Sequence, residues 1–157
     1  MALPTVQLDE IYRDVILDHY RSPRGRTELA HCDCKNDGLN PTCGDEISLC
    51  LAFDGDKVDR VHADCRGCSI SVASASMLAE LLPGRTKAEV QELLTAFKSM
   101  MHGEPVPEGL DIGDLDALQG VQKFPVRVKC ALLAWTTLED ALKVDNGGSR
   151  RASTSEG

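Results

Sequence analysis

The sequence predicts an α+β domain in which a small antiparallel sheet of about three strands packs against helices, with one N-terminal helix and a long C-terminal helix. Two observations lead to this prediction. Residues 46–53 alternate between apolar and polar side chains, and a second strand-like run follows after a short turn. The segments on either side repeat their apolar residues at helical spacing. The 157 residues are enough for one compact domain with its own core.

Residues 7–20 are predicted to form the first helix, because their apolar side chains recur three or four positions apart: Leu8, Ile11, Tyr12, Val15 and Ile16. The pair Ser22-Pro23 ends this helix, since the residue before a proline avoids helical geometry. Residues 24–42 are rich in Gly, Asn, Asp and Pro and show no periodicity, so we expect a loop there.

A β-hairpin is predicted next. One face of residues 46–53 carries four apolar side chains, Ile47, Leu49, Leu51 and Phe53, and the other carries Glu46, Ser48 and Cys50. Residues 54–57 form a turn, and residues 58–64 follow as the second strand. A hairpin alone is only marginally stable, so helices or a third strand must cover its apolar face.

Helices are predicted for the remainder of the domain. Residues 69–82 are small and apolar and stop at Pro83-Gly84. Residues 86–101 begin with Thr86 and Glu89, which have the spacing of a capping box. A loop over residues 102–113 and a short helical turn over residues 114–118 precede a long helix over residues 125–142, which opens with a proline. We expect one domain over residues 1–143 and a disordered tail over residues 144–157.

Composition excludes several classes of function. The formal net charge of −8 argues against nucleic acid as the main partner, because phosphate binding needs a basic face. No apolar run approaches the roughly 20 residues of a membrane span, and the first residues lack the pattern of a signal peptide. We therefore expect a cytoplasmic protein. Its seven cysteines are better explained as metal ligands, reactive thiols or core residues than as disulfides, which reducing conditions disfavour.

Three segments carry side chains suited to binding a metal ion. Cys43 and Asp45 are two positions apart just before a strand, so they project to the same side. Cys68 lies where the second strand leads into a helix, and a helix N-terminus favours the thiolate. Cys130 lies in the first turns of the last helix beside two basic residues, Arg127 and Lys129. Three thiolates and a carboxylate select zinc or an iron–sulfur cluster over magnesium or calcium. The spacing alone leaves scattered core or surface thiols as an alternative.

These segments resemble a known family. The stretches Asn-Pro-Thr-Cys-Gly-Asp (40–45), Gly-Cys-Ser-Ile-Ser (67–71) and Phe-Pro-Val-Arg-Val-Lys-Cys-Ala (124–131) are similar to those of the IscU/NifU-N superfamily of iron–sulfur cluster assembly proteins. Two features resemble its SufU branch. Lys129 stands where IscU-type scaffolds carry a histidine, and the segment between Cys68 and Cys130 is longer than in those scaffolds.

The resemblance implies a zinc-dependent sulfur carrier with an IscU-like fold. Carried over residue by residue, its zinc ligands are Cys43, Asp45, Cys68 and Cys130. Cys43 would accept persulfide sulfur from a cysteine desulfurase of the SufS type, whose own histidine would replace Cys43 on the zinc ion. Such a chain is a sulfur acceptor and activator of the desulfurase rather than a stand-alone enzyme, and it acts with downstream cluster-assembly proteins as a monomer or weak homo-oligomer.

Two other functions remain open at this stage. The same ligands could build an iron–sulfur cluster, which would make the chain a scaffold, although Lys129 in place of histidine weighs against this. A purely structural zinc domain is the third possibility, but structural sites are usually closed and composed only of Cys and His. Asp45 therefore favours an exchangeable site. Arg127 is the best candidate for a side chain that supports the ligands, and Lys129 is a second candidate.

The other cysteines have simpler interpretations. Cys65 forms a Cys-x-x-Cys pattern with Cys68, but the family motif requires only Cys68. We expect Cys32 and Cys34 to be exposed thiols in a polar loop, and Cys50 to pack within its strand. His19, His62 and His102 are expected to be surface or structural residues rather than metal ligands, with orientation of the N-terminal segment as an alternative role for His19.

Overall fold

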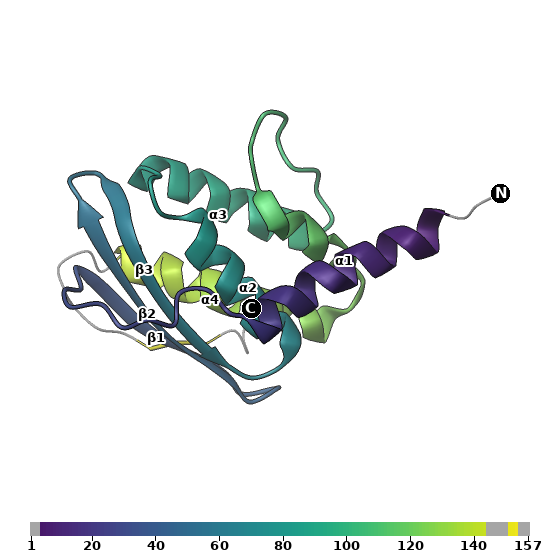
Figure 1. The fold of residues 1–157 in the computed structure, drawn as a ribbon, viewed down its shortest axis with the longest axis horizontal. Coiled ribbons are helices and arrows are strands. Elements are labelled where there is room, and N and C mark those ends of the chain that lie inside the picture. Colours follow the sequence, from purple (N-terminus) through teal and green to yellow (C-terminus); the bar gives the residue numbers. More distant parts are fainter. Residues whose placement is uncertain (1–3, 144–150, 154–157) are drawn as a thin grey trace.

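Three antiparallel strands form the centre of the protein (Figure 1). The structure, a computed structural model, describes residues 4–143 and 151–153. Its elements follow in the order α1 (Pro4–Arg21), β1 (Cys34–Asn40), β2 (Asp45–Asp54), β3 (Lys57–Arg66), α2 (Ser69–Leu81), α3 (Lys87–Met101), the 3-10 helix η1 (Gly113–Lys123), α4 (Pro125–Lys143) and β4 (Arg151–Ser153). The predicted α+β class is confirmed.

The sheet has the strand order β3-β2-β1-β4. β1 pairs antiparallel with β2, and β2 pairs antiparallel with β3. The predicted hairpin is therefore present, and Ile47, Leu49 and Leu51 are buried as expected. β4 adds to the free edge of β1 in parallel, with Asp37 opposite Arg151. Residues 144–150 and 154–157 lie outside the described part of the chain, so the predicted disordered tail over residues 144–157 stays a prediction.

β1 is a strand that the sequence does not predict, since residues 24–42 read as a loop. Its inward positions are Cys34, Asn36, Gly38 and Asn40, of which only one is a typical core residue, so the apolar alternation is missing. Asn36 is buried because its Nδ2 donates to the carbonyl oxygen of Thr137 at 3.1 Å. A polar inward face thus becomes stable through hydrogen bonds to α4 rather than through apolar burial.

Helices α2 and α4 cover the inner face of the sheet, α2 against β3 and α4 against β1 (Figure 1). Four consecutive small residues of α2 are all buried, which lets this helix pack closely: Ala73, Ser74, Ala75 and Ser76. Trp135 of α4 is fully buried and donates from Nε1 to Ser74 Oγ at 3.1 Å, and its ring contacts Phe97 of α3 in a tilted arrangement with 5.2 Å between ring centroids. The predicted capping box at the start of α3 is present.

Helix α1 is attached to this core by a buried histidine. His19 Nδ1 lies 2.7 Å from Ser76 Oγ of α2, and Nε2 lies 2.8 Å from Asp114 Oδ2 of η1. Val15 and Ile16 pack against the core, whereas the side chains of Leu8 and Ile11 lie outside the described residues. His19 is therefore a structural residue that attaches the N-terminal helix to α2 and η1. Within the described ranges, no helix is long and apolar enough to cross a bilayer.

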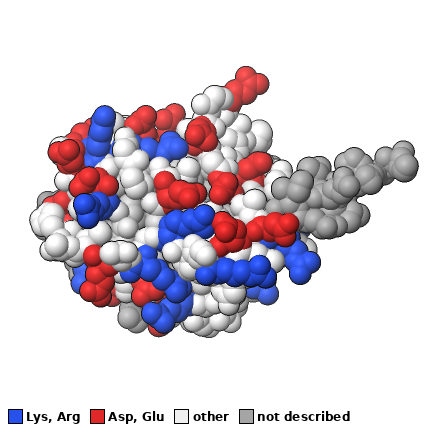
Figure 2. Space-filling model, in the orientation of Figure 1, with Lys and Arg blue, Asp and Glu red and all other residues white. Residues whose placement is uncertain are grey.

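Charged side chains are mixed on the face shown in Figure 2. Lys and Arg lie interspersed with Asp and Glu there, instead of forming one continuous basic surface. This face therefore gives no support to a nucleic-acid partner.

Candidate metal centre

The predicted ligands come from three elements that meet at one end of the sheet. Cys43 lies in the turn between β1 and β2, and Asp45 is the first residue of β2. Cys68 is the N-cap of α2, directly after β3, and Cys130 lies in the second turn of α4. The turn is closed by a hydrogen bond from the Gly44 amide to the Asn40 carbonyl at 2.9 Å, and Gly44 adopts a positive φ of 74°.

The donor atoms lie close together. Those of Cys43, Asp45 and Cys130 all lie within 4.8 Å of one another. The two sulfur atoms of Cys43 and Cys130 are 3.5 Å apart, and Cys68 Sγ lies 3.9 Å from Asp45 Oδ2. Cys68 does not belong to the tight group of three, but it touches that group through Asp45. All four residues singled out in the sequence therefore meet in one place.

These distances fit a tetrahedral zinc ion. Zinc–sulfur bonds of about 2.3 Å imply roughly 3.8 Å between two thiolates on one ion. The separation of 3.5 Å between Cys43 Sγ and Cys130 Sγ is close to that value, and Cys68 Sγ lies 3.9 Å from the oxygen ligand, Asp45 Oδ2. A set of three sulfur atoms and one carboxylate oxygen is also the chemistry that zinc accepts and that magnesium and calcium do not.

The ligands differ in exposure. Cys43 is exposed, Cys68 is half-buried, and Asp45 and Cys130 are each 0% exposed. Burial is the main cause that raises the pKa of Cys130 above its ordinary value, followed by hydrogen bonds with Asp45 and Cys43. Cys43 is consequently the thiol that another molecule can reach, while Cys130 and Asp45 are held beneath it.

Asp45 is held in place from two sides. Its Oδ1 accepts a hydrogen bond from the Cys68 backbone amide at 2.9 Å, which links the first and second motifs directly. Gly67 packs against the same carboxylate, so closely that a Cβ at this position would lie 2.8 Å from Asp45 Cγ. Only glycine allows the start of α2 to approach the carboxylate in this way.

Asn40 is a residue of this site that sequence reasoning missed. It is fully buried, and its Nδ2 lies 3.3 Å from Asp45 Oδ2 and 3.7 Å from Cys130 Sγ, so one amide donates toward two of the predicted ligands. Its Oδ1 is buried without a hydrogen-bond partner. The only signal in the sequence is its place as the first residue of the motif at residues 40–45.

Arg127 supplies positive charge beside the ligands. The neighbouring Cys68 thiolate raises the pKa of Arg127, through its charge and through a hydrogen bond, and Cys130 and Cys43 contribute in the same direction. Arg127 therefore lies near the candidate ligands, and its supporting role stays a prediction. Lys129 is half-buried and lines a cavity of about 570 Å³ between α3 and α4, and its role at the metal centre stays a prediction.

Cys65 lies close to the candidate ligand Cys68 in the sequence, but it is not one of the clustered donor residues. It is 2% exposed on the inner face of β3, and burial raises its pKa to about 12. It does not join the group of three donors formed by Cys43, Asp45 and Cys130. In the Cys-x-x-Cys pattern, Cys65 is therefore a thiol of the core and Cys68 is the candidate metal ligand.

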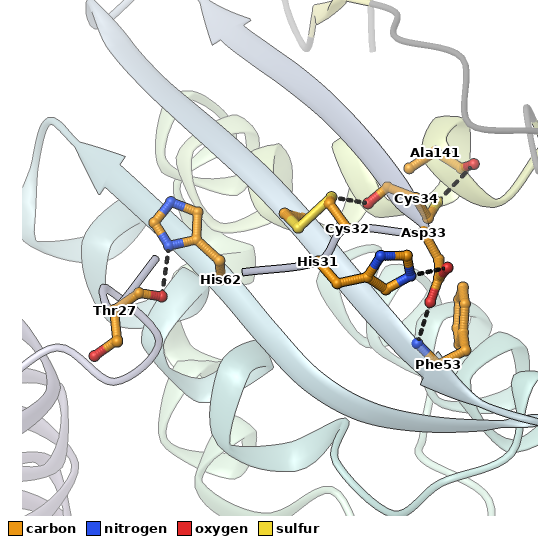
Figure 3. Close-up of a disulfide and its surroundings, with 9 residues drawn as sticks. Thr27, His31, Cys32, Asp33, Cys34, Phe53, His62 and Ala141 are labelled. Carbon is orange, nitrogen blue, oxygen red and sulfur yellow. Dashed lines mark hydrogen bonds and ion pairs between the residues drawn. A yellow bond between two sulfur atoms is a disulfide. The ribbon is translucent and has the colours of Figure 1, made fainter. Parts of the chain in front are cut away.

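The predictions for Cys32 and Cys34 are wrong, whereas Cys50 is buried in β2 as expected. Cys32 and Cys50 form a disulfide, so Cys32 is not a thiol and Cys50 does more than pack (Figure 3). Cys34 is buried rather than exposed, and its Sγ donates to the carbonyl oxygen of Ala141 in α4 at 3.0 Å. Sequence reasoning placed Cys32 and Cys34 in one polar loop, whereas Cys34 begins β1 and contacts α4, and Cys32, which precedes that strand, is bonded to Cys50 of β2.

A second group of potential donors, around His19, is an ion-pair network. His19, Glu80 and Asp114 have donor atoms within 4.8 Å of one another. Both ring nitrogens of His19 are already hydrogen-bonded, and the Arg24 guanidinium lies 3.4 Å from Glu80 Oε2. The positive charge of the Arg24 guanidinium therefore already balances the acidic side chains of this group, as a bound metal ion would.

Comparison with known proteins identifies the family. The family model of the NifU-like N-terminal domain matches residues 11–131, which is most of the chain. The chain belongs to this family. The matched region ends one residue after Cys130, so it contains all four candidate ligands.

Individual relatives of this NifU-like chain cover nearly its full length. The zinc-dependent sulfurtransferase SufU of Bacillus subtilis (strain 168) is 42% identical over 147 residues, which are 90% of this chain and 96% of that protein. The iron–sulfur cluster assembly scaffold protein IscU of Streptococcus pyogenes serotype M1 is 38% identical over 137 residues, covering 87% and 86%.

A crystal structure also aligns with this family member. It is that of FiSufU from Fervidobacterium islandicum AW-1, assigned as a cluster assembly scaffold of the SUF system. It superposes with a TM-score of 0.77 at 36% identity, covering 82% of this chain and 94% of that one. The resemblance to the SufU branch, expected from the sequence, is confirmed.

Proposed function

We propose that this chain is a zinc-dependent sulfur carrier that accepts persulfide sulfur from a cysteine desulfurase, of the SufS type, for iron–sulfur cluster assembly in the cytoplasm. Cys43, Asp45, Cys68 and Cys130 would hold the zinc ion. The observation that carries the proposal is the exposure of one ligand thiol, Cys43, directly above buried Cys130 and Asp45. The similarity to a SufU protein named as a zinc-dependent sulfurtransferase supports it.

A bound zinc ion stabilises its cysteine ligands as thiolates. The Cys43 thiolate attacks the terminal sulfur of the donor's persulfide, a new sulfur–sulfur bond forms at Cys43, and the donor cysteine leaves as a thiolate. No oxidant or reductant is consumed, because the sulfur atom moves between two thiols. Arg127 places a positive charge where an anionic persulfide would approach.

The buried residues confine this chemistry to one position. Cys130 is 0% exposed and Cys65 is 2% exposed, so neither can meet a persulfide on another protein. Asn40 and the Cys68 amide hold the Asp45 carboxylate, which keeps this ligand in place while Cys43 reacts.

The second candidate function is a scaffold on which an iron–sulfur cluster is assembled and passed on. The sulfur-rich donor set and the 38% identity to a scaffold protein favour it. The two functions differ in the metal they require: a carrier holds zinc, whereas a scaffold holds iron and sulfide.

The first test is to purify the chain and measure bound zinc and iron by elemental analysis. The carrier predicts one zinc ion per chain and little iron, with loss of zinc in a Cys43→Ala variant. Iron with acid-labile sulfide after anaerobic purification would favour the scaffold instead. Absence of both metals would refute the assignment of the site.

The second test is transfer itself. Incubation with a cysteine desulfurase and cysteine should add one sulfur atom to the chain, and peptide mass spectrometry should place it on Cys43. Cys65→Ala is the matched control, because it removes a nearby thiol that the structure places in the core. Sulfur on Cys65 or Cys130 in the folded chain would contradict the proposal.

A further inference from the structure

The segment between α1 and β1 crosses the outer face of the sheet, opposite the helices. We call residues 24–33 the strap. It begins at the edge of β3, where the Gly25 carbonyl accepts a hydrogen bond from the Ala63 amide at 2.7 Å. The Thr27 carbonyl then lies 3.0 Å from His62 Nδ1 (Figure 3). The strap ends at Asp33, whose amide donates to the Leu51 carbonyl at 2.9 Å. The strap therefore passes from β3 across to β2 and β1.

A disulfide fastens the end of the strap to the sheet. Cys32 of the strap is bonded to Cys50 in the middle of β2 (Figure 3). Next to it, Asp33 Oδ2 accepts a hydrogen bond from the Phe53 amide at 2.8 Å, and Asp33 Oδ1 pairs with His31. Cys32 is half-buried, whereas Cys50 is 8% exposed, so Cys32 is the sulfur more open to attack.

The disulfide lines a hollow between the strap and the sheet. This hollow has a volume of about 460 Å³, and both cysteines of the disulfide, Cys32 and Cys50, line its wall. Lys35 contributes a positive charge to the same wall, and three acidic residues, Glu28, Asp37 and Asp64, contribute negative charges. A hollow of this size and charge pattern suits a small molecule that carries both a carboxylate and an ammonium group.

The hollow lies far from the metal centre. Cys50 is paired with Lys35 in the β1–β2 ladder, whereas the metal-centre residue Asp45 is paired with Asn40 at the end of that ladder. Five residues along a strand at about 3.4 Å each separate the two positions by roughly 17 Å. A molecule in the hollow therefore does not touch the candidate zinc ligands.

We propose that Cys32–Cys50 is a second site of sulfur chemistry, a disulfide that exchanges with a small zwitterionic thiol bound in this hollow. The thiolate of the small molecule attacks Cys32 Sγ, and the bond between Cys32 and Cys50 breaks. Cys50 leaves as a thiolate and takes up a proton, while Cys32 carries the small molecule as a mixed disulfide. The protein disulfide is the oxidant and the small thiol is oxidised, so no further reagent is needed.

The test uses the full chain with its metal bound and reduced glutathione as the zwitterionic thiol. After incubation and alkylation, peptide mapping should find glutathione on Cys32, alkylation on Cys50 and an unchanged zinc content. Cys32→Ser should abolish the adduct. Lys35→Glu should slow its formation several-fold, while Lys57→Glu, an exposed lysine outside the hollow, should leave the rate unchanged.

Three results would overturn the proposal. The first is that Cys32 and Cys50 stay as thiols after mild air oxidation of the folded chain. The second is a disulfide that reacts with glutathione only after denaturation, which would make it purely structural. The third is an equal slowing by Lys35→Glu and Lys57→Glu, which would show that the hollow does not bind the thiol. None of these results depends on whether Cys43 carries sulfur.

Discussion

Gly67→Ala should weaken zinc binding although it alters no ligand. Gly67 joins β3 to α2 and has a positive φ of 155°. A Cβ added there would overlap the Asp45 carboxylate and lie 2.8 Å from its Cγ and 2.9 Å from its Cα. The Cα belongs to the first residue of β2, so it cannot move without shifting the strand. The start of α2 must therefore move away from Asp45.

The size of the effect follows from the contact that is lost. Moving α2 breaks the hydrogen bond from the Cys68 amide to Asp45 Oδ1, which measures 2.9 Å. A hydrogen bond to a charged group contributes about 1.5–3 kcal/mol. Asp45 and Cys68 are both proposed ligands, so the original geometry must be restored for zinc to bind. We therefore expect zinc affinity to fall by about 10- to 150-fold.

The assay is competition for zinc against a chromophoric chelator, together with thermal unfolding of the metal-free chain. Gly84→Ala is the matched control, because Gly84 also has a positive φ, of 89°, but no atom lies within 4 Å of the new Cβ. It carries the backbone strain without the collision, so its zinc affinity should equal that of the wild type. Equal affinities for Gly67→Ala and Gly84→Ala would refute this reasoning.

Four further predictions concern single residues. Asn40→Asp should weaken zinc binding, because it adds a negative charge beside Asp45 and Cys130. Asn36→Asp on the same strand should lower only the stability of the fold. Chelator competition measures the zinc affinity of both variants, and urea denaturation measures their stability. Cys65, with its pKa raised to about 12, should resist iodoacetamide at neutral pH in the folded chain, and rapid labelling in a peptide map would contradict its burial. Thr86→Ala should cost about 1 kcal/mol of stability in urea denaturation without changing zinc affinity. The hydrogen bond from the Thr86 amide lowers the pKa of Glu89. The stability that Glu89 contributes is therefore fully present above the carboxyl pKa of the unfolded chain, and it is lost as the pH falls through the lower pKa of the folded chain. Urea denaturation of the wild type and of Glu89→Gln across acidic pH measures this loss.

Local patterns in the sequence determined most of the elements. The alternation of residues 46–53 predicts β2, because a period of two places Ile47, Leu49 and Leu51 on one face whatever covers them. The capping box of α3 and the proline that opens α4 are equally local signals. The motifs around Cys43, Cys68 and Cys130 identified the candidate ligands through the family resemblance, and the structure brings these residues together.

Other features were decided only by the tertiary structure, because they depend on partners far away in the chain. β1 has almost no apolar alternation and becomes a strand through pairing with β2 and the hydrogen bond of Asn36 to α4. The bond between Cys32 and Cys50 depends on the path of the strap across the sheet. The role of Asn40 depends on its burial between Asp45 and Cys130. Residue types and spacing carry chemistry, but only the packed fold decides which polar groups lose water and must pair with each other.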